Sequence, residues 1–246
     1  MPSPSARADV FLVEHGYAQT RAEAQEAIEA GKVFFSGRRV IKPSQTLNET
    51  GRIQYERAHP YVSRGALKLA GALNHFQLTP HNLTCLDIGA STGGFTEVLI
   101  LRGAVNIYAV DVGHGQMNPK LIKDPRVVLL EGVNARDLTE KQISQKPQAI
   151  VADVSFISLK LALPNALAMA EQGAWLIALV KPQFEVGKEN IGKGGIVKDE
   201  AAQQNALAEI SRWLAEDQNW SVLGAMESTI KGGDGNREFL IAARKP

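Results

Sequence analysis

Residues 84–95, Thr-Cys-Leu-Asp-Ile-Gly-Ala-Ser-Thr-Gly-Gly-Phe, decide the expected fold of most of the chain. They indicate an apolar strand that ends at Asp87, then a glycine-rich loop, then a helix that begins near Gly93. In open parallel sheets, ligands bind beyond the carboxyl ends of the strands at such a turn. Glycine residues in the loop let the backbone approach a ligand more closely than any side chain would allow. The stretch therefore predicts a ligand site at the end of its strand.

Apolar strands and helices alternate along the rest of this region. Further strands are predicted at residues 106–110, 127–131, 148–152 and 174–180. Because these strands lack polar alternation and are separated by helices, they indicate a parallel sheet that is covered on both faces. Residues 219–227 and 237–243 then predict a final hairpin. The expected fold class is α/β, a Rossmann-like sheet of the methyltransferase type, mostly parallel with a C-terminal antiparallel hairpin.

The glycine loop lacks the dinucleotide fingerprint Gly-x-Gly-x-x-Gly, which serves pyrophosphate binding and which a nucleoside bearing methionine does not need. The second strand ends at Asp111, whose carboxylate could accept both ribose hydroxyls of an adenosine. Asn134 follows the third strand, where an adenine edge would lie. Alternatively, acidic residues at strand ends only cap the following helices. The expected cofactor-binding residues are Asp87, Gly89, Ala90, Ser91, Gly93, Gly94, Phe95, Asp111 and Asn134.

The first 58 residues predict a separate, small α+β domain. A short helix over residues 8–15 precedes a second helix, which opens with the Thr-x-x-Glu spacing of a capping box at residues 20–23. Residues 33–41 then predict a tight hairpin, and residues 51–55 predict one more strand. We place the second, larger domain at residues 59–246.

The predicted hairpin is basic. No acidic residue lies between Ala30 and Asn48, and four basic residues do, so this surface could follow a phosphate backbone. A solvated hairpin without a ligand explains the same charges equally well. The net charge of the chain is only +1 and favours neither interpretation. The candidate RNA-binding residues are Arg7, Arg21, Lys32, Arg38, Arg39 and Arg64.

The composition argues against several classes of protein. The single cysteine, Cys85, cannot form an intramolecular disulfide and is expected to be a buried thiol. The five histidines show no metal-site spacing, so no metal is expected. We find no signal-peptide core and no stretch of about 20 apolar residues that would span a membrane. We therefore expect a cytoplasmic protein.

Four charged residues stand where they could act on a bound substrate. Lys68 lies in a helix just ahead of the glycine loop, and Glu238 opens the last predicted strand. Asp153 and Lys181 end two apolar strands. Because the carboxyl ends of parallel strands face the ligand crevice, these two side chains should lie near each other. An ordinary salt bridge explains each residue equally well.

Four motifs carry a resemblance to a known family: Ser63-Arg-Gly-Ala-Leu-Lys-Leu, Asp87-Ile-Gly-Ala-Ser-Thr-Gly-Gly-Phe, Ala152-Asp-Val-Ser-Phe-Ile-Ser and Val180-Lys-Pro-Gln-Phe-Glu. Over nearly its whole length, the chain resembles the TlyA family of ribosomal RNA methyltransferases, also called hemolysin A. Residues 6–55 resemble an RNA-binding domain first described in a ribosomal small-subunit protein. The larger domain is similar to FtsJ-type ribose 2′-O-methyltransferases. It departs from many of them in having Ala-Ser-Thr-Gly-Gly where they have a proline-containing loop.

The resemblance implies S-adenosylmethionine as cofactor, a cytidine ribose as acceptor, and ribosomal RNA or ribosomal subunits as partners. The Lys-Asp-Lys-Glu catalytic set of the family falls on Lys68, Asp153, Lys181 and Glu238. In that set a deprotonated Lys181 would accept the proton of the ribose hydroxyl, with Asp153 and Glu238 orienting the lysine and the sugar. Lys68 would stabilise the developing alkoxide.

Three other interpretations stay open at this point. A membrane-active hemolysin is suggested by the family label, but neither a membrane span nor a secretion signal supports it. An RNA-binding protein that keeps the cofactor as a structural ligand would not need the four charged residues. An NAD enzyme is disfavoured by the glycine pattern. The glycine- and lysine-rich residues 184–198 predict a loop that could hold RNA or close on cofactor, or a plain surface loop.

Overall fold

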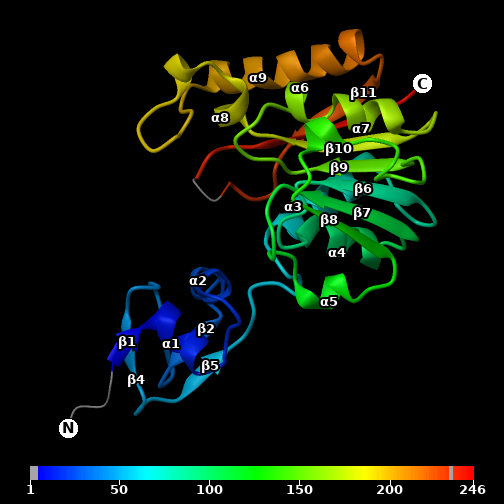
Figure 1. Cartoon of the computed structure of the whole chain (residues 1–246). Helices are drawn as coiled ribbons and strands as arrows, with labels where there is room; N and C mark the ends of the chain where they lie inside the picture. Colours follow the sequence, from blue (N-terminus) through cyan, green and yellow to red (C-terminus); the bar gives the residue numbers. More distant parts are fainter. Residues whose placement is uncertain (1–4, 233–234) are drawn as a thin grey trace. The chain divides into compact units, whose positions relative to one another are not determined.

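The computed structural model describes residues 5–232 and 235–246. The chain folds as two compact units, Met1–Tyr61 and Val62–Pro246 (Figure 1). The predicted boundary follows residue 58, three residues before the observed one. Each unit has its own apolar core, so each is described by itself.

The smaller unit packs two helices against short strands. Its elements are β1 (Ser5–Arg7), α1 (Ala8–Glu14), α2 (Arg21–Glu29), β2 (Val33–Phe35), β3 (Arg38–Arg39), β4 (Thr46–Asn48) and β5 (Ile53–Tyr55). β1 pairs with β4, and β2 lies between β3 and β5, all antiparallel. The Thr20 hydroxyl caps α2 by accepting from the Glu23 amide at 3.2 Å. The Glu23 carboxylate accepts from the Gln19 amide instead of the Thr20 amide of a capping box.

The larger unit is built on one seven-stranded sheet in the order β11-β12-β10-β9-β6-β7-β8. Its strands are β6 (Thr84–Ile88), β7 (Asn106–Asp111), β8 (Val127–Glu131), β9 (Ala149–Ala152), β10 (Trp175–Val180), β11 (Ser221–Glu227) and β12 (Phe239–Arg244). The strands from β10 to β8 run parallel, whereas β12 is antiparallel to both β10 and β11. The predicted parallel sheet with a C-terminal antiparallel hairpin is confirmed.

Helices cover both faces of this sheet (Figure 1). On one face lie α3 (Gly65–Phe76) and α4 (Gly94–Leu101), which pack on each other and on the strands. The other face is covered by α6 (Leu159–Ala162), α7 (Pro164–Met169) and α9 (Glu200–Arg212). The remaining short helices are α5 (Pro119–Ile122), α8 (Pro182–Glu185), η1 (Ala135–Asp137), η2 (Lys188–Asn190) and η3 (Trp213–Asp217).

The core explains why these strands form where they do. Every residue of β6, β9 and β10 is buried, as expected for central strands of a sheet that is covered on both faces. Because β9 pairs in parallel register with β6 on one side and β10 on the other, the three strands end along one edge. The glycine loop, Asp153 and Lys181 follow these three ends directly. The fold thus brings together groups that are far apart in the sequence.

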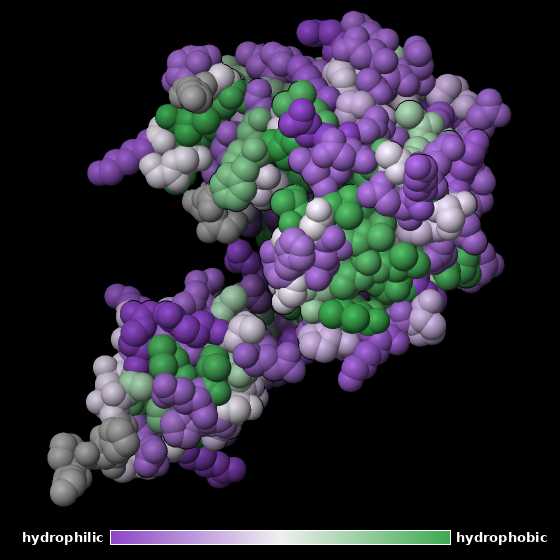
Figure 2. Space-filling model, in the orientation of Figure 1, coloured by the Kyte–Doolittle hydropathy of each residue, from purple (hydrophilic) through white to green (hydrophobic). Residues whose placement is uncertain are grey.

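The surface of the larger unit is polar over most of the face seen in Figure 2, but hydrophobic side chains gather over the region of α5, β7 and β8. β8 is an edge strand of the sheet. Exposed apolar side chains in this part of the chain include Leu101, Val105, Val112, Ile122 and Val128.

Candidate active site

A pocket of about 230 Å³ lies beyond the carboxyl ends of β6, β9 and β10. Three of the four predicted catalytic residues, Lys68, Asp153 and Lys181, line it. Five predicted cofactor-binding residues line it too: Gly89, Ala90, Ser91, Gly94 and Phe95. The remaining lining residues are Ser63, Arg64, Gly65, Thr92, Ser155 and Ile230. The pocket therefore joins the glycine loop to the charged residues in one site.

The loop glycines are required by close packing. Gly89 has a φ of 81°, and a Cβ there would collide with the backbone carbonyl oxygen of Asp153. A Cβ on Gly94 would collide with the Ser63 hydroxyl. Gly93 has a φ of 94° and caps the N-terminus of α4. A Cβ at any of these positions would push the loop away from its neighbours, and at Gly89 and Gly93 it would also strain the backbone, because only glycine adopts positive φ angles readily.

Asp87 is the second-last residue of β6, just before the glycine loop, and it is fully buried. Its Oδ2 accepts a hydrogen bond from the Thr96 hydroxyl at 2.6 Å. Its Oδ1 has no hydrogen-bond partner within the described part of the chain. Burial raises the pKa of this carboxyl to about 7, and the nearby Asp153 and Asp111 act in the same direction, while the Thr96 hydroxyl opposes them.

We expect the buried Asp87 to make stability depend on pH. In the folded protein the carboxyl keeps its proton up to about pH 7, whereas its ordinary pKa is 3.8. The contribution of Asp87 to the free energy of unfolding therefore falls as pH rises from about 4 to about 7 and is constant above that. Asp87→Asn removes this pH-dependent contribution. The free energy of unfolding of the variant should therefore rise relative to that of wild type as pH increases from about 4 to about 7. Urea unfolding at a series of pH values measures the difference.

The readout is specific for the larger unit, because all three tryptophans, Trp175, Trp213 and Trp220, lie in Val62–Pro246. Fluorescence therefore reports the unfolding of the sheet that contains Asp87. A constant difference between wild type and Asp87→Asn from pH 4 to pH 8 would show that this carboxyl does not titrate in the interval.

Asp111 and Asn134 lie outside the pocket lining. The Asp111 carboxylate holds the loops around it, since Oδ2 accepts from the Ser91 amide and Oδ1 from the Gly113 amide, both at 2.7 Å. Asn134 caps η1 by accepting from the Arg136 amide at 3.1 Å. A capping role, weighed from the sequence for acidic residues only, is thus present at Asn134. At Asp111 the carboxylate is tied to the glycine loop itself.

Lys181 and Asp153 form an ion pair at the pocket. The Lys181 ammonium lies 2.6 Å from Asp153 Oδ1 and donates to the Ser155 hydroxyl at 2.8 Å. The exposed fractions of the two charged side chains are 11% and 22%. The prediction that these two residues lie together is confirmed.

Glu238 reaches the same site from the antiparallel strand. In the β10–β12 ladder Phe239 pairs with Val180, so Glu238 and Lys181 both stand just beyond the paired segment. The Glu238 carboxylate is buried and accepts from the Lys68 ammonium of α3 at 2.6 Å. Gly232 packs against this carboxylate so closely that a Cβ would collide with it. Each lysine of the predicted set is thus held by one carboxylate.

Two features of the site were missed by sequence reasoning. Ser155 stands in the motif Ala152-Asp-Val-Ser-Phe-Ile-Ser but was given no role, and only the structure shows its hydroxyl beside the Lys181 ammonium. Phe156 is 91% exposed and has a φ of 65°, a backbone region that side chains rarely adopt. Its ring lies 5.2 Å, centroid to centroid, from that of Phe184 on α8. An exposed Phe in an apolar motif gives no signal from sequence, because such residues are usually buried.

The basic candidates are distributed over both units. Arg64 lines the pocket of the larger unit. In the smaller unit, Arg38 and Arg39 are exposed on β3, and the Lys32 ammonium forms an ion pair with Glu56 at 2.9 Å. Arg7 and Arg21 both bind the carboxylate of Asp9.

Two further predictions concern a loop and a metal. In the 184–198 segment, the Asn236 side chain donates to the Gly195 carbonyl oxygen and accepts from the Val197 amide, both at 3.0 Å. Among the described residues, no cluster of three histidine, cysteine, aspartate or glutamate side chains could hold a metal ion.

Comparisons with known proteins agree with this geometry. Residues 61–245 match the FtsJ-like methyltransferase model, and residues 6–53 match the S4 domain model. The chain is 44% identical to the 16S/23S rRNA (cytidine-2′-O)-methyltransferase TlyA of Mycobacterium tuberculosis, over 97% of this chain and 90% of that protein. It is 38% identical to hemolysin A of Brachyspira hyodysenteriae, over 95% and 98%. A solved structure described as a hemolysin from Streptococcus thermophilus is 40% identical, covers 99% of this chain and 89% of its own, and has a TM-score of 0.78.

Proposed function

Because the chain belongs to the TlyA family of FtsJ-like methyltransferases, with an S4 domain ahead of the catalytic domain, we propose that it transfers the methyl group of S-adenosylmethionine to a ribose 2′-hydroxyl of ribosomal RNA. One observation carries this proposal. The pocket joins a glycine loop that can take a nucleoside cofactor to two lysines, each of which is held by a carboxylate. The relatives' names point to cytidine as the methylated nucleotide.

The residues around the glycine loop fit the cofactor. The backbone at Gly89 and Gly94 leaves no room for side chains, which keeps the loop close to any bound nucleoside. The unpartnered Oδ1 of Asp87 offers a buried polar atom next to this loop, to which a donor group of the cofactor can hydrogen-bond. Each oxygen of the Asp111 carboxylate accepts one amide and keeps a lone pair for a ribose hydroxyl.

We expect Asp111→Ala to weaken S-adenosylmethionine binding by roughly 10- to 100-fold, the value of hydrogen bonds to a charged acceptor. The variant loses both the predicted ribose contacts and the Ser91 amide contact that shapes the loop. Isothermal titration calorimetry measures the affinity, and thermal unfolding checks that the variant folds. Wild-type protein that bound NAD and ignored S-adenosylmethionine would contradict the cofactor assignment.

The charged residues have separate tasks in the proposed reaction. S-adenosylmethionine, when bound, supplies an electrophilic methyl group on a sulfonium. The Lys181 amine, once it has lost its proton, accepts the proton of the ribose 2′-hydroxyl, and Asp153 and Ser155 fix the direction in which it points. Lys68, held by Glu238, places a positive charge at the same pocket and stabilises the negative charge that develops on the ribose oxygen. Holding the hydroxyl in line with the methyl group supplies much of the remaining rate.

The aromatic pair, of which Phe156 is exposed, is suited to the target base. Phe156 follows Ser155, which lines the pocket, and Phe184 lies on α8 just after Lys181. Unstacked RNA bases bind by stacking on exposed aromatic rings, and base stacking contributes about 1–3 kcal/mol per base. A base stacked on Phe156 would leave its ribose near Lys181. Phe156 has a φ of 65° and is exposed directly after the pocket residue Ser155.

The smaller unit, which we assign to RNA binding over residues 1–58, should deliver the substrate. We expect neutralising Lys32, Arg38 and Arg39 together to weaken RNA binding and to flatten its salt dependence, because each lost phosphate contact reduces counterion release. Each contact accounts for about 0.9 in the slope of log affinity against log salt concentration on duplex DNA, and about 0.7 on single strands. Lys32 should contribute least, since Glu56 already pairs with it. Exposed charges contribute little to stability, so the unit should stay folded. A salt slope equal to that of wild type would mean that the hairpin is only a solvated surface.

Transfer of labelled methyl groups into RNA tests the activity. Wild-type protein is incubated with labelled S-adenosylmethionine and with ribosomes that lack the modification, and we expect the label in the RNA. Cofactor and RNA binding without any transfer would identify an RNA-binding protein that holds the cofactor as a structural ligand.

The hemolysin name of some relatives raises the question of a membrane span. Within residues 5–232 and 235–246, no helix is long and apolar enough to cross a membrane. From the proposed ribosomal RNA substrate we infer a cytoplasmic location.

A further inference from the structure

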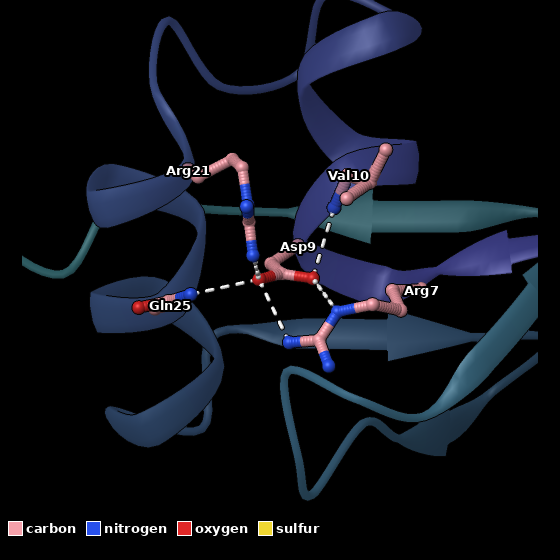
Figure 3. Close-up of polar contacts among 5 residues, drawn as sticks. All are labelled: Arg7, Asp9, Val10, Arg21 and Gln25. Carbon is pink, nitrogen blue, oxygen red and sulfur yellow. Dashed lines mark hydrogen bonds and ion pairs between the residues drawn. The ribbon is translucent and has the colours of Figure 1, made fainter.

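The smaller unit buries one carboxylate completely. Asp9, in the first turn of α1, is 0% exposed. Figure 3 shows the side chains that converge on it from two other elements: Arg7 at the end of β1, and Arg21 and Gln25 on α2. The Arg7 guanidinium donates from Nε to Oδ1 at 3.0 Å and from Nη2 to Oδ2 at 3.1 Å. Arg21 donates to Oδ2 from Nη2 at 2.9 Å and from Nε at 3.3 Å.

Two more donors complete the arrangement. Gln25 Nε2 donates to Oδ2 at 2.7 Å, and the Val10 amide donates to Oδ1 at 3.1 Å. The Arg7 guanidinium, with help from Gln25 and Arg21, holds the pKa of Asp9 well below its usual range. Asp9 is therefore a permanent counter-charge that two cations share, and the group carries one net positive charge.

The two arginines are placed side by side without being buried. Both Nη2 atoms contact the same carboxylate oxygen, Asp9 Oδ2. The Arg7 and Arg21 side chains are 50% and 58% exposed, whereas the carboxylate that holds them is not exposed at all. Within the described residues, Nη1 of neither arginine has a hydrogen-bond partner. Two guanidinium groups thus present donors to solvent from one fixed position.

We propose that Asp9 is a positioning residue that holds Arg7 and Arg21 together as a fork for a single RNA phosphate. Without the carboxylate, like charges would keep the two guanidinium groups apart in free protein. With it, the fork is already assembled when RNA arrives, which reduces the entropic cost of binding. Guanidinium groups match phosphate oxygens by paired hydrogen bonds, which an ammonium group cannot reproduce. The proposal rests on the RNA substrate proposed above.

The alternative is that Asp9 has only a structural role, in which its ion pairs and hydrogen bonds connect β1 and α1 to α2. A buried ion pair is weak evidence for stability, because an apolar residue of similar size often stabilises a protein as well or better. The two roles predict opposite effects on RNA affinity. Asp9→Asn makes the chain more positive by one charge, so a purely structural Asp9 would leave RNA binding unchanged or make it tighter. A positioning Asp9 would make it weaker.

The experiment measures the dissociation constant of the full-length protein for ribosomal RNA that lacks the modification, by filter binding at several salt concentrations. We expect Asp9→Asn to weaken binding by at least about 10-fold, with a flatter salt slope. In an Arg7→Gln/Arg21→Gln background, Asp9→Asn should change affinity less than about 2-fold, because the residues through which it acts are gone. Hydrogen exchange of the α2 amides reports whether the unit is folded.

A matched control lies in the other unit. Arg126 donates to Asp124 from Nε at 2.9 Å and from Nη2 at 2.8 Å, with the same two-residue spacing as Arg7 and Asp9. Asp124→Asn adds the same charge and should leave RNA affinity within about 2-fold of wild type. If Asp9→Asn unfolds the smaller unit, Arg7→Lys/Arg21→Lys decides the question, since it keeps both charges and loses the fork geometry.

The outcomes separate this inference from the proposed function. The lysine double variant should bind at least about 10-fold more weakly at an unchanged salt slope. RNA affinity in Asp9→Asn or in the lysine double variant that equals or exceeds that of wild type overturns the fork. Wild-type protein that binds no RNA removes the proposed substrate instead, whatever Asp9 does.

Discussion

Replacing Lys181 with Met is expected to slow methyl transfer by at least about 100-fold, the lower range for the loss of a general base. Methionine keeps much of the side-chain length and the apolar stem but has no amine to accept a proton. The lysine is 11% exposed and contacts both Asp153 and Ser155, so its position is fixed by two partners. The variant should still fold, because the Asp153 carboxylate, 22% exposed, faces the pocket and keeps access to water.

The control for this prediction is Lys160→Met. Lys160 lies outside the pocket and pairs with Glu209 on the surface, so its removal should leave the rate unchanged. Single-turnover assays with saturating cofactor give the transfer rate, and calorimetry confirms that Lys181→Met still binds S-adenosylmethionine. A normal rate in Lys181→Met refutes its role as the base. Lysis of red cells by wild type and Lys181→Met alike would instead support the hemolysin interpretation.

Breaking the Lys68–Glu238 pair should destabilise the larger unit by about 3–5 kcal/mol, the cost of leaving a buried charge without its partner. Both side chains are below 10% exposed, and the ammonium lies 2.6 Å from the carboxylate. Lys68→Met leaves the buried carboxylate without its partner, and Glu238→Gln leaves the buried ammonium without its partner. The double variant leaves no unpaired charge, so its loss of stability should be smaller than the sum of the two single losses. Urea unfolding followed by tryptophan fluorescence measures all four states.

The exposed Lys160–Glu209 pair is the matched comparison. Its two atoms are 3.0 Å apart, but the side chains are 37% and 55% exposed. Solvent screening should limit the coupling of this pair to under about 1 kcal/mol. If Lys68→Met costs no more stability than Lys160→Met, then the pocket is wetter than the structure indicates, and the positive charge of Lys68 is screened in the reaction as well.

The large sheet could be predicted because its strands are long, apolar and uninterrupted. Buried strands such as β6 and β10 leave this pattern in any sequence, and the glycine loop marks where the first of them ends. The strands β1 and β4 could not be predicted. Each has only three residues, and the two partners lie far apart in the sequence, so no hairpin turn marks them as the Ser36-Gly37 turn marks β2 and β3.

In the candidate site too, the features that have a sequence signal could be predicted and the others could not. Parallel strand ends meet at one edge, so the sequence could predict that Asp153 and Lys181 lie together. The partner of each lysine depends on side-chain direction and on the antiparallel register of β12, and neither has a sequence signal. Ser155 was missed because its contact with Lys181 depends on side-chain direction, and Phe156 because a phenylalanine is usually buried. Asp9 was missed because a lone acidic residue at the start of a helix usually caps or complements the helix dipole.

The most direct test of the account is the chemical position of the transferred methyl group. Ribosomal RNA that lacks the modification is incubated with the protein and labelled S-adenosylmethionine, digested to nucleosides, and separated by mass spectrometry. The account predicts the label on the ribose of cytidine, as 2′-O-methylcytidine, with the wild-type protein and none above background with Lys181→Met. A label on a base, or RNA that stays unlabelled while the cofactor is bound, would contradict it.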